Sequence, residues 1–262
     1  MRIVWTIAAR ELRSFLSSPI AWAVITLFLL VFGGFFWLFL ADFASTSTQI
    51  YQYMGDPAYE EMLGEVNLTG WVLRPLFGNT QVLFLLLVPA LTMRLFSEEK
   101  KQGTYEFLLT SPLTVAQLVA GKYLAGLAMV SMLLLCSAVF PAALYLVGSP
   151  ETPAILTGYL GLLLLGGAFV AVGTFASSIT ENQIIAAVLT FATLLFFWII
   201  SWASTVVGGA VAELMTFVSF LDHFEDFTKG VLDTRHLVYY LSFIAFFLLL
   251  AGRAVEAVRW KR

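Results

Sequence analysis

Six long apolar runs decide what this chain can fold into. Each has about the 20 mostly apolar residues that a transmembrane helix needs, and together they hold one charged residue, Arg94, near the end of the second run. Only 12% of the residues are charged, against ~25% in soluble domains, so the chain lacks the polar groups to cover a surface in water. The sequence therefore predicts an all-α polytopic membrane protein, one domain over residues 1–262. The expected spans are residues 20–41, 75–96, 123–147, 154–178, 184–207 and 237–252.

The basic residues indicate how these spans are oriented. Six spans put both termini on one side of the membrane, and placing that side inside leaves 11 of the 14 Lys and Arg residues cytoplasmic. Because Lys and Arg are enriched in cytoplasmic loops, we expect a multi-pass protein of the inner (cytoplasmic) membrane with both termini cytoplasmic. The first run is too long for a signal-peptide core and no A-x-A site follows it, so we expect it to be a retained span.

The segments outside the spans have their own patterns. Residues 1–18 show apolar side chains at three- and four-residue steps and arginines on the opposite face, which predicts an amphipathic elbow helix lying on the cytoplasmic leaflet. Residues 42–74 form an external region, with a short helix expected to begin at Asp56. Residues 208–235 form a second external region, where an apolar stripe from Phe217 to Val231 predicts one amphipathic helix on or in the outer leaflet.

Two features of the sequence allow more than one interpretation. Asp222, His223, Glu225 and Asp226 are potential metal ligands, but they also look like the solvated face of a helix, and no second histidine lies at ligand spacing on that face. We therefore predict no metal site. Cys136, the single cysteine, lies in an apolar run and is expected to be a small buried residue without a redox role.

The residues that are missing narrow the function. There is no G-x-x-x-x-G-K-[ST] phosphate-binding loop, so this chain is not expected to bind ATP that way. The spans hold no Asp, Glu, Lys or His, which disfavours an ion-coupled carrier. The two histidines, His223 and His236, lie at the second external region, so an intramembrane enzyme is also disfavoured. We expect no catalytic residues, no cofactor and no nucleic-acid partner for this chain; any energy must come from another protein.

The stretch that such a protein would contact is the connection after the second span, residues 97–113. It reads "SEEKKQGTYEFLLTSP" from Ser97 to Pro112 and combines charges of both signs, a glycine and four large apolar residues in five positions. One interpretation is a solvated loop with cytoplasmic lysines. The other is a short amphipathic element with a charged rim, which is the kind of surface on which a partner docks.

These residues resemble a known family. The pattern E-x-x-x-x-G-T-x-E-x-L-L-x-S-P, from Glu98 to Pro112, is similar to the cytoplasmic loop of ABC-2 type transporter permeases, and residues 220–240 look most similar to the gliding-motility-type members. The resemblance implies a permease subunit that pairs with a second, similar permease subunit and binds a separate ABC ATPase, which carries ATP and Mg. It also implies a coupling helix in residues 97–113. The implied ATPase-coupling residues are Glu98, Gly103, Thr104, Glu106, Phe107, Leu108, Ser111 and Pro112, with Glu181 in the second cytoplasmic turn.

The pathway and the task of the machine remain open at this point. The resemblance implies that the second and fifth spans face the dimer axis, and the residues expected there are Pro89, Phe191, Phe197, Trp198 and Trp202. These rings are equally expected to face lipid or a neighbouring helix. The favoured function is export or translocation across the membrane. The alternative is a membrane anchor of a motility or envelope machine, which passes no substrate and transmits ATPase work to an external protein.

Overall fold

The fold was obtained as a computed structural model, which describes residues 2–52, 67–105, 113–204 and 208–260. Within these residues the chain is helical and has no strand. Six helices are long and apolar enough to cross a membrane, which confirms the all-α polytopic fold predicted from the sequence. They cover Pro19–Gln52, Thr69–Lys101, Val115–Val147, Thr152–Ile179, Gln183–Ile200 and Thr234–Ala257.

Two of these spans, the second and the third, consist of more than one helical segment. The elements are α1 (Arg2–Ser17), α2 (Pro19–Gln52), the π-helical turn η1 (Thr69–Leu73), α4 (Arg74–Thr92), α5 (Arg94–Lys101), α7 (Val115–Ser137), α8 (Val139–Val147), α9 (Thr152–Ile179), α10 (Gln183–Ser204), α11 (Ala210–Val218), α12 (Phe220–Thr228) and α13 (Thr234–Trp260).

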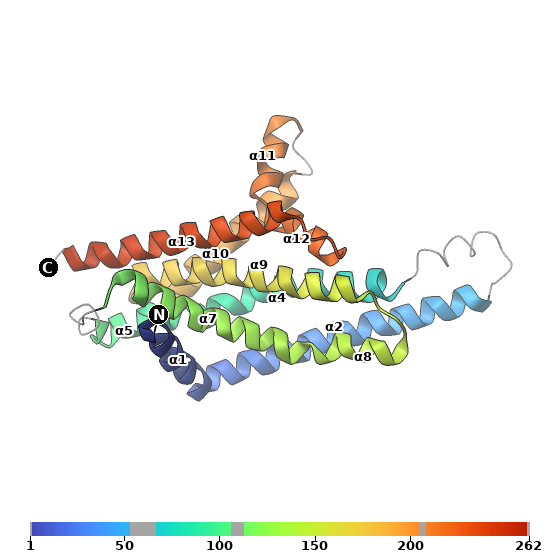
Figure 1. The fold of residues 1–262 in the computed structure, drawn as a ribbon, viewed down its shortest axis with the longest axis horizontal. Helices are drawn as coiled ribbons and strands as arrows, with labels where there is room; N and C mark the ends of the chain where they lie inside the picture. Colours follow the sequence, from blue (N-terminus) through green and yellow to red (C-terminus); the bar gives the residue numbers. More distant parts are fainter. Residues whose placement is uncertain (1, 53–66, 106–112, 205–207, 261–262) are drawn as a thin grey trace.

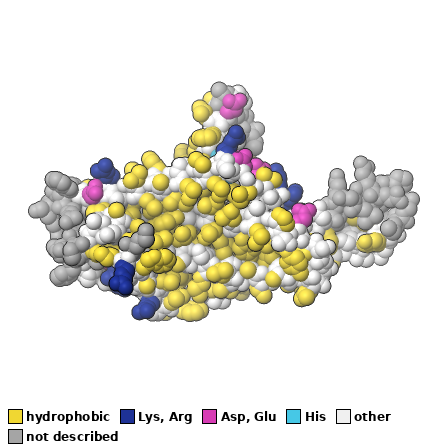
Figure 2. Space-filling view, in the orientation of Figure 1, with side chains coloured by type: hydrophobic (Ala, Val, Ile, Leu, Met, Phe, Trp, Pro, Cys, Tyr) yellow, Lys and Arg dark blue, Asp and Glu magenta, His cyan; other side chains and the backbone are white. Residues whose placement is uncertain are grey.

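The helices form an elongated bundle with two different ends (Figure 1). At one end, here called the elbow end, α1 lies across the bundle beside α5, and the C-terminal part of α13 reaches the same end. The opposite end, here called the α12 end, carries η1, the turn between α8 and α9, and α12, with α11 projecting away from the bundle. The space-filling view in Figure 2 shows an apolar belt between these ends.

The centre of the bundle is α9, which packs against α4, α7, α10, α12 and α13. Its glycines make this close packing possible. A Cβ at Gly173 would lie 2.0 Å from the Thr92 side chain of α4, and one at Gly161 would lie 2.8 Å from Phe227 of α12. The sequence suggested close helix approach here, and the structure confirms it. The most apolar stretches of the second and fourth spans are 61% buried, whereas those of the first, fifth and sixth are 28%, 17% and 22% buried. The free apolar faces therefore belong to α2, α10 and α13.

Several sequence predictions need correction. Helix α2 continues to Gln52, well beyond residue 41. The expected single helix in residues 208–235 is two helices, because Ser219 ends α11 and caps α12 with its side chain. The predicted stripe is also only partly buried: Phe220, Phe224 and Phe227 of α12 pack into the core, while Phe217 and Val231 are exposed. Cys136, expected to be buried, is exposed on the apolar belt. The helix expected at Asp56 lies outside the described residues.

Candidate functional site

The second span ends in a short helix that is fastened to α9. Helix α4 ends at Thr92 and α5 begins at Arg94, but the break is slight, because Met93 between them keeps helical dihedral angles and its N–H donates to the Pro89 carbonyl (3.0 Å). After the break, α5 continues to Lys101, so the first part of the expected loop 97–113 is an extension of the span. The backbone N–H of Phe96 donates to Ser177 Oγ of α9 (2.9 Å), and Lys100 Nζ donates to the carbonyl of Ser178 (2.5 Å). Both contacts tie α5 to the last turn of α9.

A glycine ends α5 in a defined way. Gly103 has a φ of +71°, a left-handed conformation that glycine adopts at little cost. The N–H of Thr104 donates to the Glu99 carbonyl (3.0 Å) and the N–H of Gly103 to the Lys100 carbonyl (3.2 Å). These two bonds form a Schellman motif, which satisfies carbonyls at a helix C-terminus. The positive φ explains why a glycine stands at position 103.

The chain then folds back toward the helix it has just left. Tyr105 is buried, and its ring stands edge-on to Phe96 of α5, with ring centroids 6.5 Å apart. Lys100 Nζ lies 5.3 Å from the centre of the Tyr105 ring. Burial, together with nearby Glu99, raises the pKa of the Tyr105 phenol to about 12, so this side chain stays neutral. Tyr105 thus anchors the beginning of the segment that follows Gly103.

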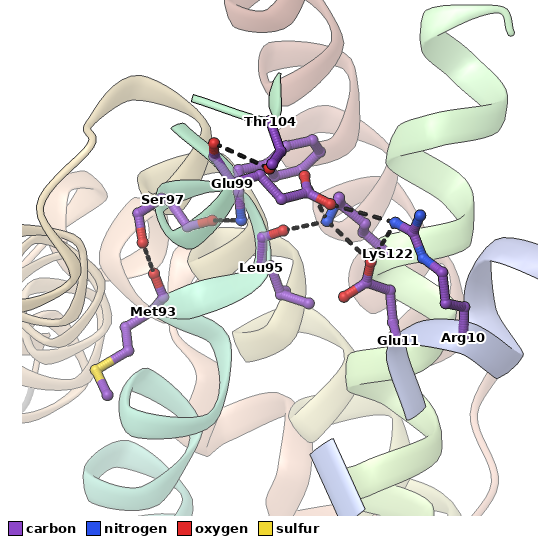
Figure 3. A network of polar contacts seen from close by, with 10 residues as sticks. Arg10, Glu11, Met93, Leu95, Ser97, Glu99, Thr104 and Lys122 are labelled. Carbon is purple, nitrogen blue, oxygen red and sulfur yellow. Dashed lines mark hydrogen bonds and ion pairs between the residues drawn. The ribbon is translucent and has the colours of Figure 1, made fainter. Parts of the chain in front are cut away.

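A buried lysine joins α5 to two other helices. Lys122 of α7 is completely buried, yet its ammonium pairs with Glu11 of α1 (3.2 Å) and with Glu99 of α5 (2.9 Å). It also donates to the Leu95 carbonyl of α5. Arg10 lies within 2.9 Å of Glu11 and 3.3 Å of Glu99. Figure 3 shows the Lys122 amine between the two carboxylates, with Arg10 beside them. Two cations and two anions balance in this cluster, here called the Lys122 cluster.

Apolar contacts reinforce the same junction. The Arg94 guanidinium lies over the Phe15 ring of α1, 4.2 Å from its centre, a cation–π contact between the elbow and α5. Helix α7 carries Gly121 where α1 crosses it, and a Cβ there would lie 2.7 Å from Ile7. Thr114 caps α7 through a reciprocal capping box with Gln117. The elbow, α5 and the start of α7 therefore form one packed unit.

The structure locates part of the predicted coupling set. Glu98, Gly103 and Thr104 lie on the last turn of α5 and its cap, and Thr104 is exposed. Glu181 is exposed in the turn between α9 and α10, next to the serines that hold α5, so the two predicted cytoplasmic contact elements lie together. The remaining predicted residues lie outside the described residues; they are Glu106, Phe107, Leu108, Ser111 and Pro112.

The predicted pathway residues do not converge on one surface. Pro89 is buried within α4, and Phe197 packs against Phe220 of α12 and Phe243 of α13, with ring centroids 5.5 and 5.1 Å apart. Trp202 is exposed, Phe191 is half-buried, and the Trp198 Nε1 is buried without a hydrogen-bond acceptor among the described residues. The most apolar stretch of the second span is 61% buried against other helices of the same chain, and the expectation that this span faces a dimer axis stays a prediction.

The α12 end holds a polar contact that the sequence did not predict. His236 of α13 reaches His223 of α12, with Nδ1 to Nδ1 at 2.7 Å, and its Nε2 lies 2.9 Å from Asp226. His223 Nε2 contacts the Phe217 carbonyl (3.0 Å), and burial lowers the pKa of His223. Only one hydrogen fits between the two Nδ1 atoms, so one Nδ1 donates and the other accepts. No group of three or more His, Cys, Asp or Glu side chains placed to hold a metal ion occurs in the described part of the chain.

The Lys122 cluster was also not predicted from the sequence, although the sequence contains a signal for it. Lys122 was counted only as one of the cytoplasmic charges. It is, however, a single lysine between Gly121 and an apolar run. Gly121 is the small residue that permits α1 to approach α7. A charge in that position has to be paired, because an isolated buried charge is costly. Its carboxylate partners, Glu11 and Glu99, lie 111 and 23 residues before it in the chain, so no local sequence pattern identifies them.

Comparisons with known proteins identify the family. A search of the curated proteins matches nothing. The family model described as "ABC-2 family transporter protein" matches residues 5–255, a range that takes in the elbow, all six spans and the Lys122 cluster. The chain belongs to the ABC-2 family of transporter proteins.

Proposed function

We propose that this chain is the permease subunit of an ABC transporter and that a separate ATPase subunit docks at its elbow end. In this proposal the elbow end faces the cytoplasm, both termini lie there, and the membrane is the inner (cytoplasmic) membrane. ATP and Mg belong to the partner, which agrees with the missing phosphate-binding loop in this chain.

One observation carries the proposal. The segment that resembles the coupling loop begins at a glycine-capped helix, and the Lys122 cluster ties that helix to α1 and α7 while Ser177 and Ser178 tie it to α9. A push on residues 98–104 would therefore displace the elbow and parts of the second, third and fourth spans together. Close-packed elements transmit strain because interiors have low compressibility.

The second permease subunit has a candidate surface in the same proposal. The most apolar stretch of α10 is only 17% buried, so this span keeps a free apolar face although it packs against α9 and α4. We propose that α10, together with the free face of α2, contacts the second subunit, the same chain or a similar one. This places the dimer contact on the first and fifth spans instead of the second and fifth.

The alternative function has an observation of its own. At the α12 end, α11 projects from the bundle (Figure 1) and exposes Val211, Leu214 and Phe217. Such a projection suits the binding of an external accessory protein, as expected of an anchor that transmits ATPase work and passes no substrate. The likeness to gliding-motility-type permeases favours the same alternative.

Two experiments test the proposal. Single cysteines at Lys101 and Glu225, in a Cys136→Ala background, should react with an impermeant thiol reagent from the cytoplasmic side and the outside, respectively; the reverse pattern would contradict the orientation. In vesicles that contain the permease and its ATPase, stimulation of ATP hydrolysis by a transported molecule supports export. Stimulation only by a protein added at the α12 end supports the anchor.

A further inference from the structure

A cleft of about 340 Å³ opens between α4 and α12 at the α12 end. One wall is a single face of α4, formed by Arg74, Gly78 and Gln81, which follow one another at helical spacing. The opposite wall comes from α12, with Asp222 and, near its C-terminus, Lys229. Figure 2 shows acidic and basic side chains together near this end, whereas the middle of the bundle is apolar. The volume is in the range of small-molecule sites.

Two polar groups in this cleft have no partner among the described residues. Gln81 is only 5% exposed, lies about two turns into α4, and its side-chain amide makes no hydrogen bond within the described chain. Asp222 Oδ2 is also buried without a hydrogen-bond donor. A polar group without a hydrogen-bond partner lowers the free energy of unfolding most when its surroundings are apolar. These two side chains therefore point to a ligand that supplies donors and acceptors.

The α4 wall of the cleft has open space in front of Gly78. Helix α4 is tightly packed next to it, since Leu76 and Phe77 are almost completely buried. A Cβ added at Gly78, however, would meet no other atom within 4 Å. The glycine thus leaves a space on the cleft wall that a larger side chain would fill without touching the protein.

The charges around the cleft define the chemistry of the ligand. Lys229 is already bound by Glu225 (2.7 Å), whereas the Arg74 guanidinium forms no ion pair within the described chain. Guanidinium groups bind phosphate through two parallel hydrogen bonds, and the Asp222 carboxylate, which lines the cleft and forms no ion pair within the described chain, attracts a cation. The ligand therefore carries a phosphate and an ammonium that still has N–H groups.

We propose that this cleft binds the phosphoethanolamine headgroup of a membrane lipid. Its phosphate lies on Arg74, its ammonium on Asp222, and the Gln81 amide contacts the headgroup from the membrane side. Arg74 is the first charged residue of the second span, Thr69–Lys101, so the site lies near the end of that span, at the level of the lipid headgroups. The proposal depends only on α4 crossing the membrane, and it is independent of any ATPase partner or orientation.

The test is lipid retention by the full-length protein, measured by native mass spectrometry with lipids of matched acyl chains. We expect phosphatidylethanolamine to be retained about tenfold or more over phosphatidylcholine, which has no N–H on its cation, and over phosphatidylglycerol, which has no cation. Gly78→Leu should remove this preference by filling the cleft. Gly34→Leu is the matched control, since a Cβ at Gly34 of α2 also meets nothing within 4 Å.

Two charge variants check the assignment without filling the cleft. Asp222→Asn should bring phosphatidylethanolamine down to the level of phosphatidylcholine, while Arg74→Gln should weaken all three phospholipids. Equal retention of phosphatidylethanolamine and phosphatidylcholine by the unmodified protein would overturn the proposal, as would an unchanged preference in both Gly78→Leu and Asp222→Asn. Thermal stabilisation by soluble glycerophosphoethanolamine, lost in Asp222→Asn, would support the same recognition chemistry and make a soluble molecule the ligand.

Discussion

Replacing Lys122 by methionine tests how strongly the elbow, α5 and α7 are joined. Methionine keeps the length and the apolar stem of the side chain, but it removes the ammonium that lies 3.2 Å from Glu11 and 2.9 Å from Glu99. The two carboxylates then share only Arg10, whose side chain is 58% exposed. Lys122→Met should therefore destabilise the elbow end.

The size of the effect follows from the burial of the partners. Breaking a buried ion pair by removing one partner costs about 3–5 kcal/mol. Glu11 and Glu99 keep 15% and 17% of their side chains exposed, and Arg10 remains, so the lower end applies. In a chain of this size, each kcal/mol of lost stability lowers the melting temperature by about 2–4 °C. A loss of about 3 kcal/mol in the free energy of unfolding therefore lowers it by about 6–12 °C.

The assay is thermal unfolding of the purified protein in detergent, followed by tryptophan fluorescence. Lys101→Met is the matched control, because Lys101 is exposed at the end of α5, the helix that carries Glu99, and its replacement should change the stability by at most about 0.5 kcal/mol. Combining Lys122→Met with Glu99→Gln should cost less than the sum of the two single changes, since the second removes the charge that the first leaves unpaired. A melting temperature of Lys122→Met that matches Lys101→Met would refute the reasoning.

Three further predictions follow from single sites. Gly173→Val should unfold the protein at a clearly lower temperature, because its side chain would overlap with Thr92, whereas Gly252→Val, with open space around it, should have little effect; equal melting temperatures would contradict the packing of α9 on α4. Gly103→Val places a branched residue at a φ of +71° and should cost at least about 1–2 kcal/mol, measured by denaturant unfolding. The lowered pKa of His223 means that the unfolded chain takes up a proton on this ring more readily than the folded one, so stability is complete above the ordinary pKa of 6.5 and falls as the pH drops below it. His223→Gln should show a smaller loss of melting temperature between pH 7.5 and pH 5 than the unmodified protein, and an equal loss would contradict this.

The sequence predicted the features that depend on local patterns. Runs of apolar residues predict spans because the bilayer requires about 20 of them. A glycine after two lysines similarly indicated the end of α5.

Features that depend on distant partners were not predictable from one sequence. The neutralisation of Lys122 requires α1 and α5 to meet α7, and the approach of His236 to His223 requires α13 to return beside α12. The division of residues 208–235 into two helices has a local signal in Ser219, a good N-cap residue. The continuous apolar stripe concealed it.

The central claim is that an ATPase docks on the cap of α5 at the elbow end. The most direct measurement is photo-crosslinking in cells from a reactive amino acid at Thr104, which is exposed on that cap, and in parallel at Glu225, which is exposed at the α12 end. The account predicts that Thr104 crosslinks to a chain with a nucleotide-binding P-loop, identified by mass spectrometry, and that Glu225 does not. A P-loop ATPase crosslinked from Glu225, or none from Thr104, would contradict it.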